Sequence, residues 1–196
     1  MVDLTALGLP LADLKQEAET ENANRQQQLL QRMGAMDTLT RVYNRDFFDL
    51  QLGIQWKIAA RKKECLALFL IDVDHFDAFT ARHDHRSADY ALQKIARTLK
   101  LLFRRASDFV ARDEADRFIV LAADMTAAQA EEHAARIRDR VQKLKILDAP
   151  PRHYLTVSVG CAVCTPLPSD QLEDMVVSAG QALARAQSQN PGKFPS

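Results

Sequence analysis

The segment that decides the fold is Phe109-Val-Ala-Arg-Asp-Glu-Ala-Asp-Arg-Phe-Ile-Val-Leu-Ala-Ala123. Two apolar runs, Phe109–Arg112 and Phe118–Ala123, flank a short charged tip. Short runs rich in β-branched and aromatic residues, separated by a few polar residues, are typical of antiparallel strands joined by a tight turn. The segment therefore predicts a β-hairpin.

Further helix and strand patterns lie on both sides of this hairpin. Cys65–Val73 is a continuous apolar run, which is typical of a central strand covered on both faces. Ser87–Phe103 repeats its apolar residues with a helical period. The other expected elements are a helix over Arg45–Arg61 capped by Asn44, a helix over Thr126–Leu147 capped by Thr126, a strand near Leu155–Val163 and a helix over Ser169–Gln187. This order predicts an α+β fold of ferredoxin-like type, with an antiparallel-rich central sheet flanked by helices.

The N-terminal segment has a different composition from the rest of the chain. Residues 1–10 resemble a tail, and Leu11–Met36 is a polar stretch rich in Glu, Gln, Asn and Ala that predicts a helical extension. Its apolar residues are too sparse for a self-sufficient coiled-coil seam. Two interpretations stay open, a signalling or dimerising helix and a linker helix with a solvated face. We predict that residues 1–36 are this tail and helix, that residues 37–190 are the folded domain, and that residues 191–196 are a C-terminal tail.

Bulk composition excludes several classes of protein. The 196 residues carry 26 basic and 26 acidic side chains, so no charge excess points to nucleic acid or to a membrane surface. The longest apolar runs have the length of strands, too short for a bilayer, and the N-terminus lacks the pattern of a signal peptide. Three cysteines point to reduced thiols rather than to a disulfide framework, and Cys161 and Cys164 are expected to pack in the core. We predict a soluble, cytoplasmic protein.

Five short motifs follow one another among the expected elements. They are Asp37-Thr-Leu-Thr-Arg-Val-Tyr-Asn-Arg45, Leu70-Ile-Asp-Val-Asp-His-Phe76, Ser87-Ala-Asp89, Glu114-Ala-Asp-Arg-Phe118 and Thr156-Val-Ser-Val-Gly160. In order and spacing they resemble motifs of the GGDEF family, the bacterial diguanylate cyclases, over about four-fifths of the chain. The resemblance implies a nucleotide-cyclase-type sheet and a place in cyclic di-GMP signalling.

The resemblance also implies where GTP and metal would bind. Joining two GTP molecules into cyclic di-GMP requires carboxylates that hold divalent metal ions against the triphosphate. The family's metal ligands match Asp72, at a strand end, and Asp116, at the hairpin tip, and a guanine-binding Asp matches Asp89. Magnesium is the implied cofactor if any GTP binding remains.

Other positions of this implied active site hold unsuitable residues. Glu114 and Ala115 replace glycines that let the backbone approach phosphate closely, and Glu114 adds a negative charge. Arg117 stands in place of the second acid of the family signature and reverses its charge. Three further positions, a guanine-binding Asn and two Lys in the family, are Thr80, Asp77 and Gln187. We therefore expect a degenerate domain without useful cyclase activity.

The family's product site is better preserved. Arg105 and Asp108 match its R-x-x-D pair, which binds cyclic di-GMP, and Arg136 matches a second arginine on the following helix. Arginine suits this role because its planar fork donates bidentately and stacks on bases. The leading hypothesis is a regulatory module that binds cyclic di-GMP and forms a homodimer when the ligand bridges two domains. The same three side chains could instead be inherited surface residues.

Two other functions stay open. The chain could be a protein–protein interaction module that binds no nucleotide and recruits a partner through the N-terminal helix or the altered tip. It could also be a weak cyclase or a GTP-binding regulator that uses Asp72, Asp89 and Asp116.

Overall fold

The computed structural model of this protein describes residues 34–148 and 154–189. The chain divides into two compact units, Met1–Met36 and Asp37–Ser196, and only the second is considered below. The predicted polar helix up to residue 33 and the tail over residues 191–196 lie outside the described residues. Within the described ranges, no helix has both the length and the apolar character needed to span a bilayer.

The second unit alternates helices and strands in nearly the predicted order. Its elements are α2 (Arg45–Lys62), β1 (Leu66–Val73), α3 (Phe76–Arg82), α4 (His85–Leu102), β2 (Phe109–Arg112), β3 (Arg117–Ala123), α5 (Ala127–Gln142), β4 (Val157–Cys164) and α6 (Leu172–Gln189). Asn44 caps α2 by accepting a hydrogen bond from the Phe47 backbone, as predicted. Thr126 and Gln129 form a reciprocal capping box at the start of α5.

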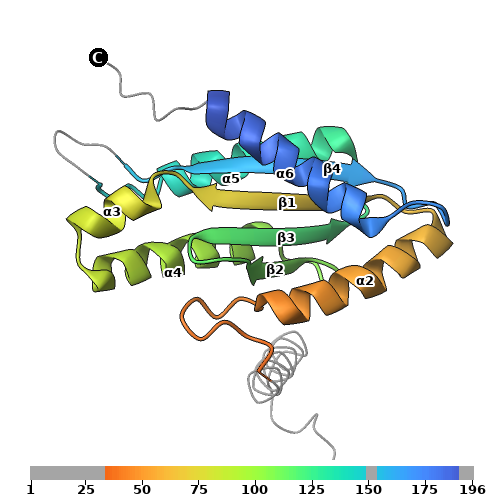
Figure 1. Ribbon diagram of the computed structural model, residues 1–196, viewed down its shortest axis with the longest axis horizontal. Coiled ribbons are helices and arrows are strands. Elements are labelled where there is room, and N and C mark those ends of the chain that lie inside the picture. Colours follow the sequence, from red (N-terminus) through yellow and green to blue (C-terminus); the bar gives the residue numbers. More distant parts are fainter. Residues whose placement is uncertain (1–33, 149–153, 190–196) are drawn as a thin grey trace, which may run out of the picture. The chain divides into compact units, whose positions relative to one another are not determined.

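The four strands form one antiparallel sheet in the order β2-β3-β1-β4 (Figure 1). This is the ferredoxin-like order, because each crossover helix carries the chain past one intervening strand. The central strand β1 pairs with β3 on one side and with β4 on the other. The predicted α+β fold with a hairpin of β2 and β3 is therefore confirmed.

Helices cover both faces of the sheet and enclose two separate apolar cores. On one face, α4 and α5 pack against alternate residues of β1 such as Phe69 and Ile71. On the other face, α2 and α6 pack against the intervening residues Leu68 and Leu70 (Figure 1). A strand buried on both faces needs apolar side chains at successive positions, which explains the unbroken apolar run in its sequence.

Strand β4 and helix α6 approach each other closely at Gly160. A Cβ atom at this position would lie 2.1 Å from the Leu183 backbone nitrogen and 2.6 Å from the Ala179 carbonyl oxygen. Glycine is therefore required here by contact rather than by backbone angle. In the same strand, the half-buried Cys161 and Cys164 pack against different cores, so the two thiols lie on opposite faces of the sheet.

The structure corrects two of the predicted elements. The short helix α3, Phe76–Arg82, was not predicted, because its seven residues offer only one turn-to-turn apolar pair, Phe76 and Phe79. The helix predicted over Thr126–Leu147 ends at Gln142 instead. Beyond it, the Leu155 backbone N–H donates to the Ile146 carbonyl at 2.8 Å, so tertiary pairing ends the helix early.

Candidate functional site

The hairpin tip closes without any left-handed residue. The backbone N–H groups of Asp113 and Glu114 both donate to the Arg117 carbonyl, at 2.8 and 3.3 Å. Neither Glu114 nor Ala115 has a positive φ. Glycine's access to positive φ is thus not needed for this tip, which accommodates two residues with Cβ atoms.

Arg117 turns its guanidinium back over the tip. It forms ion pairs with Asp113, whose side chain is 2% exposed, and with Glu114 at 2.5 Å. Arg45, at the start of α2, also forms an ion pair with Asp113. Burial acts to lower the pKa of Arg117, but the hydrogen bond to Asp113 and the charges of Asp113 and Glu114 outweigh it and raise that pKa. The tip is therefore a compact network of alternating charges.

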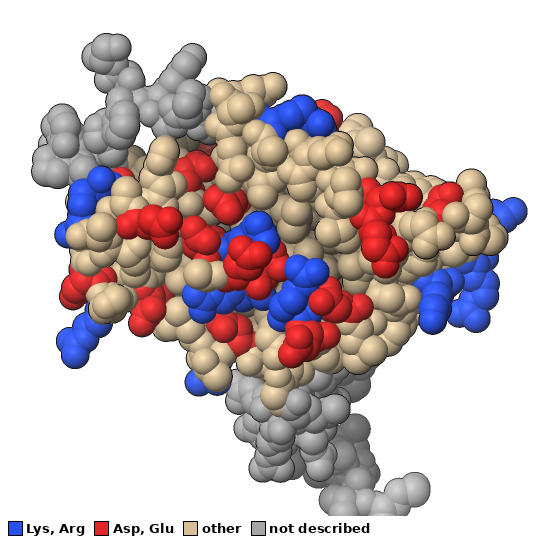
Figure 2. All heavy atoms as spheres, in the orientation of Figure 1, with Lys and Arg blue, Asp and Glu red and all other residues tan. Residues whose placement is uncertain are grey.

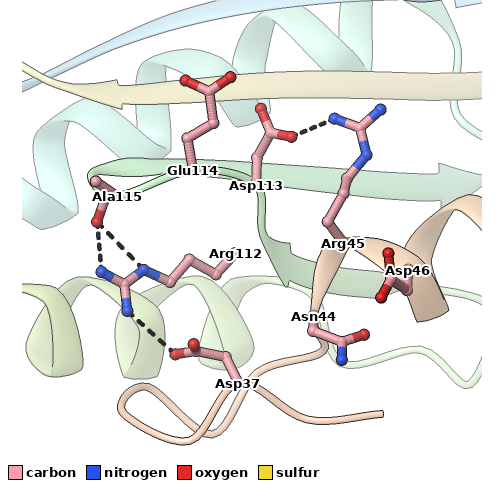
Figure 3. Close-up of a pocket in the computed structure, with 8 residues that line it drawn as sticks. All are labelled: Asp37, Asn44, Arg45, Asp46, Arg112, Asp113, Glu114 and Ala115. Atoms are coloured by element: carbon pink, nitrogen blue, oxygen red, sulfur yellow. Dashed lines mark hydrogen bonds and ion pairs between the residues drawn. The ribbon is translucent and has the colours of Figure 1, made fainter. Parts of the chain in front are cut away.

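A polar cleft of about 370 Å³ lies between the tip and the segment that precedes α2 (Figure 3). Its lining residues are Asp37, Asn44, Arg45, Asp46, Arg112, Asp113, Glu114 and Ala115. Arg112 extends through this region, donating to the Ala115 carbonyl and, at 3.4 Å, to the Asp37 carboxylate. One guanidinium thus joins the opening motif to the hairpin.

The opening motif is itself a hydrogen-bonded turn. The Asp37 carboxylate accepts from the Thr40 backbone at 2.8 Å and from the Thr40 hydroxyl at 2.6 Å. Burial acts to raise the pKa of Asp37, but these bonds and the nearby Arg112 lower it overall. Arg41 follows with φ of 58°, a left-handed conformation that side chains with a Cβ rarely adopt. A glycine would fit this position without strain.

Asp72 and Asp116 lie at neighbouring strand ends. Asp72 of β1 is paired with Arg117 of β3, and the Val73 backbone N–H donates to the Asp116 carbonyl at 3.3 Å. Burial raises the pKa of Asp72, and the Asp116 charge raises it further. Burial also raises the pKa of Asp116. The Gln187 amide donates to Asp72 at 3.1 Å, so it occupies one carboxylate oxygen.

Sequence reasoning did not identify a role for Asp74, two residues after Asp72. Its carboxylate accepts from the Thr156 hydroxyl at 2.6 Å and from the Ser158 hydroxyl at 2.7 Å. The two hydroxyls of the Thr-x-Ser motif therefore tie β4 to the end of β1. The alternation of Thr and Ser along one strand face was the available signal, since such residues face the same side.

The remaining candidates of the implied guanine pocket lie on α3 and α4. Asp89 is exposed near the start of α4. The Thr80 hydroxyl donates to the Phe76 carbonyl of its own helix at 2.6 Å. A hydroxyl engaged in this way is a weaker candidate for contacting a base.

Arg105, Asp108 and Arg136 gather near the end of α4. The Arg105 backbone N–H donates to the Asp108 carboxylate at 2.9 Å, and the Asp108 backbone donates to the Arg105 carbonyl at 3.0 Å. Arg136 on α5 is exposed and forms an ion pair with Glu132 at 2.6 Å. Sequence reasoning missed His133, whose pKa is lowered by burial and by the charges of both arginines. A lone histidine within a polar helix gave no signal of this position.

Burial raises the pKa of Asp108, against the opposing effects of the hydrogen bond from Arg105 and the charges of Arg105 and His133. Its second carboxylate oxygen, Oδ1, is buried without a hydrogen-bond partner, the one such side-chain atom in the described residues. A buried acceptor without a donor is costly. A ligand N–H group could satisfy this oxygen only after the turn shifts to expose it.

Metal-binding side chains do not cluster elsewhere in the described ranges. No group of three or more His, Cys, Asp or Glu residues there is arranged to hold a metal ion. Asp84 caps α4, and the His83 ring contacts the Asp148 carbonyl, so these two residues have structural partners. Figure 2 shows acidic and basic side chains intermixed across the middle of one face, in line with the balanced charge of the chain.

Comparison with known proteins identifies relatives of this fold. Residues 34–193 match the family model described as diguanylate cyclase, GGDEF domain. The diguanylate cyclase TpbB of Pseudomonas aeruginosa is 32% identical over 169 residues, covering 85% of this chain and 37% of that protein. The probable diguanylate cyclase DgcC of Escherichia coli is 30% identical over 157 residues, 80% of this chain and 42% of that protein. The chain thus spans about two-fifths of the length of these relatives.

A solved structure shows the same architecture. The coiled coil and GGDEF domain of DgcB from Caulobacter crescentus, crystallised in complex with c-di-GMP, superimposes with a TM-score of 0.73. The match covers 92% of this chain and 93% of that one, at 22% identity. At this identity the likeness concerns the fold.

Proposed function

This chain belongs to the diguanylate cyclase GGDEF-domain family, and from that membership we propose that it acts by binding rather than by catalysis. It is a GGDEF domain of bacterial cyclic di-GMP signalling. The specific proposal is a catalytically degenerate, cytoplasmic domain that binds cyclic di-GMP. Its ligand-binding part is residues 37–190, preceded by a polar linker or signalling helix.

The observation that carries this proposal is the place of Arg117. Its guanidinium lies beside the carboxylates of the tip, bound to Asp113 and Glu114, where the family signature has an acid. Phosphoryl transfer from GTP needs metal ions that neutralise the triphosphate, held by carboxylates. The charge of Arg117 also acts on Asp72 and Asp116, so it opposes a metal ion held by these two carboxylates. The donor set around Asp72 and Asp116 therefore fits magnesium poorly, and no catalytic step is assigned to it.

Glu114 acts against GTP in a second way. It replaces a glycine and carries a negative charge on an exposed side chain next to the tip backbone. A triphosphate approaching this backbone would meet a Cβ atom and the carboxylate of the Glu114–Arg117 ion pair. Each charge-assisted hydrogen bond to an anion contributes about 1.5–3 kcal/mol. Asp77 and Gln187 replace two lysines of the family, so the loss of such bonds weakens GTP binding strongly.

The cluster of Arg105, Asp108 and Arg136 supports cyclic di-GMP as the ligand. Two arginines can each donate bidentately to phosphate or to a guanine edge. The buried Oδ1 of Asp108 has no donor and would accept from a guanine N–H group once the turn shifts to expose it. Because cyclic di-GMP has two guanines and two phosphodiesters, one ligand assembly can also bridge two domains into a homodimer.

A second candidate is a protein–protein interaction module that binds no nucleotide. It is favoured by the bonds that these side chains already make, since Arg136 is paired with Glu132 and Asp108 is bonded to the Arg105 backbone. In that case the partner binds the N-terminal helix or the altered tip. A nucleotide ligand must break or rearrange these bonds before it binds.

Calorimetric titration of cyclic di-GMP into the protein tests the proposal. We expect the native chain to bind cyclic di-GMP. Arg105→Ala should lower the affinity by about 10- to 100-fold, which corresponds to the free energy of one charge-assisted hydrogen bond. Arg104→Ala is the matched control, because Arg104 is an adjacent exposed arginine outside the R-x-x-D pair. No binding heat at high ligand concentration would reject the receptor function and leave the interaction module. Cyclic di-GMP formation from GTP and magnesium would reject the degenerate assignment.

A further inference from the structure

His133 lies on α5, three residues before Arg136. Its ring lies edge-on to Phe103, with centroids 5.5 Å apart and an angle of 78° between the rings. Phe103 ends α4 and is followed directly by the turn that carries Arg105 and Asp108. His133 therefore joins α5 to that turn.

His133 also shares a helix face with Arg136. Residues three apart on a helix are neighbours, so the side chains of His133 and Arg136 lie on the same face of α5. His133 is half-buried, whereas Arg136 is exposed. Because the charges of Arg105 and Arg136 both act on the His133 ring, a ligand that contacts both arginines would lie near this ring.

The charged groups that act on His133 come from both elements. Arg136 and Glu132 lie on α5, and Asp108 and Arg105 lie in the turn after α4. Burial lowers the pKa of His133 and the positive charge of Arg136 lowers it further, against smaller opposite effects of Glu132 and Asp108. Without ligand, the imidazole is therefore mainly neutral at pH 7.

Binding of a cyclic dinucleotide would change this balance. Its two phosphodiesters stay charged at every pH near neutrality, and an anion close to an imidazole favours the protonated form. The phosphate would also offset the positive charge of Arg136, which opposes protonation of His133 in the free protein. Both changes act in the same direction, toward uptake of a proton.

We propose that His133 is a fourth residue of the cyclic di-GMP site and that ligand binding is coupled to protonation of its imidazole. The proposal rests on the function proposed above. It makes the domain a receptor whose affinity rises as the pH falls from 8 to 6. The protonated ring then donates to a phosphate oxygen, beside the guanidinium of Arg136.

Calorimetry of the native chain with cyclic di-GMP at pH 6, 7 and 8 tests this coupling. A rise of one pKa unit on binding limits the gain in affinity to tenfold, so we expect a gain of about fivefold between pH 8 and pH 6. Titrations near pH 6.5 in buffers of different ionisation enthalpy should show uptake of a fraction of one proton. Binding that is independent of pH in the native chain would overturn the proposal.

Three variants separate His133 from other titrating groups. His133→Gln should bind with the same affinity at pH 6 and pH 8, whereas His85→Gln, at the exposed start of α4, should keep the native pH dependence. His133→Lys carries a fixed charge and should bind tightly at both pH values. If His133→Gln retains the native pH dependence, the proton is taken up elsewhere and the proposal fails. If Gln disturbs packing against Phe103, the Lys variant still decides the question through its loss of pH dependence.

The outcomes also distinguish this inference from the function on which it rests. If cyclic di-GMP does not bind at any pH, both the receptor function and the role of His133 are rejected. Binding that Arg105→Ala abolishes, but that shows no dependence on pH, leaves the receptor function standing and overturns only the role of His133.

Discussion

The guanidinium of Arg117 forms an ion pair with the carboxylate of Asp113, four residues earlier, across the tip of the β2–β3 hairpin. The Asp113 side chain is only 2% exposed and is also bound by Arg45. A buried carboxylate needs such partners, because an unpaired charge away from water is strongly unfavourable. The substitution that removes an acid from the family signature therefore also neutralises the tip.

Arg117→Gln should lower the free energy of unfolding by about 1–3 kcal/mol, because it leaves Asp113 with one cationic partner instead of two. Urea denaturation measures this loss. Arg97→Gln, on the exposed side of α4, is the control and should change stability by less than about 0.5 kcal/mol. In a protein that already carries Asp113→Asn, Arg117→Gln should destabilise the domain clearly less. An unchanged loss of stability would mean that the Arg117–Asp113 ion pair contributes nothing.

Gly160→Ala should destabilise the domain by about 2–3 kcal/mol or more, because the added Cβ has no space against the α6 backbone. Gly180→Ala provides the matched control, since Gly180 lies within α6 and its Cβ would meet no atom within 4 Å. We expect that substitution to stabilise the helix by about 0.5–1 kcal/mol. Equal thermal midpoints for the two variants would contradict the close approach of β4 and α6.

Arg41→Gly should stabilise the domain by about 0.5 kcal/mol, as relief of the left-handed strain exceeds the added freedom of the unfolded chain. Arg41→Ala keeps the Cβ atom and should give no gain. The Lys100 ammonium bonds the Arg41 carbonyl, at 3.4 Å, so neither change removes that contact. A gain for alanine as large as that for glycine would show that the Arg41 side chain, not its backbone, is the unfavourable feature.

Asp72→Asn should raise stability at pH 7 by a few tenths of a kcal/mol, given that Asp72 is only half-buried. Burial and Asp116 raise its pKa in the folded state above the unfolded value of 3.8, so the charged form is disfavoured by folding. This penalty is complete above the folded pKa and disappears as the pH falls through it. Urea titrations at pH 7 and near pH 3 should therefore show a difference only at pH 7. Asp89→Asn, at an exposed position, serves as the control. If Asp72→Asn raised the free energy of unfolding more at pH 3 than at pH 7, the predicted direction of the pH dependence would be wrong.

Local patterns predicted most elements of this fold. The charged tip between two apolar runs identified the hairpin, and the unbroken run before Val73 identified the central strand, since each depends on residues close in sequence. The patterns failed where few residues carried the signal, as in α3, or where a distant strand partner ended an element, as for α5 after Gln142. The sequence also showed that Arg117 and Glu114 replace family residues, but it contained no information on which side chains they contact.

The sequence alone therefore determined the order of elements, the family and the chemical identity of the altered tip, because each is a property of neighbouring residues. Only the tertiary structure decided that Arg45 and Arg117 share Asp113, that Gly160 faces the backbone of Leu183, and that His133 lies beside the turn of Arg105. These relationships depend on strand register and on how the helices pack over the two cores. Register and packing come from many contacts between residues far apart in the chain, which a local pattern does not encode.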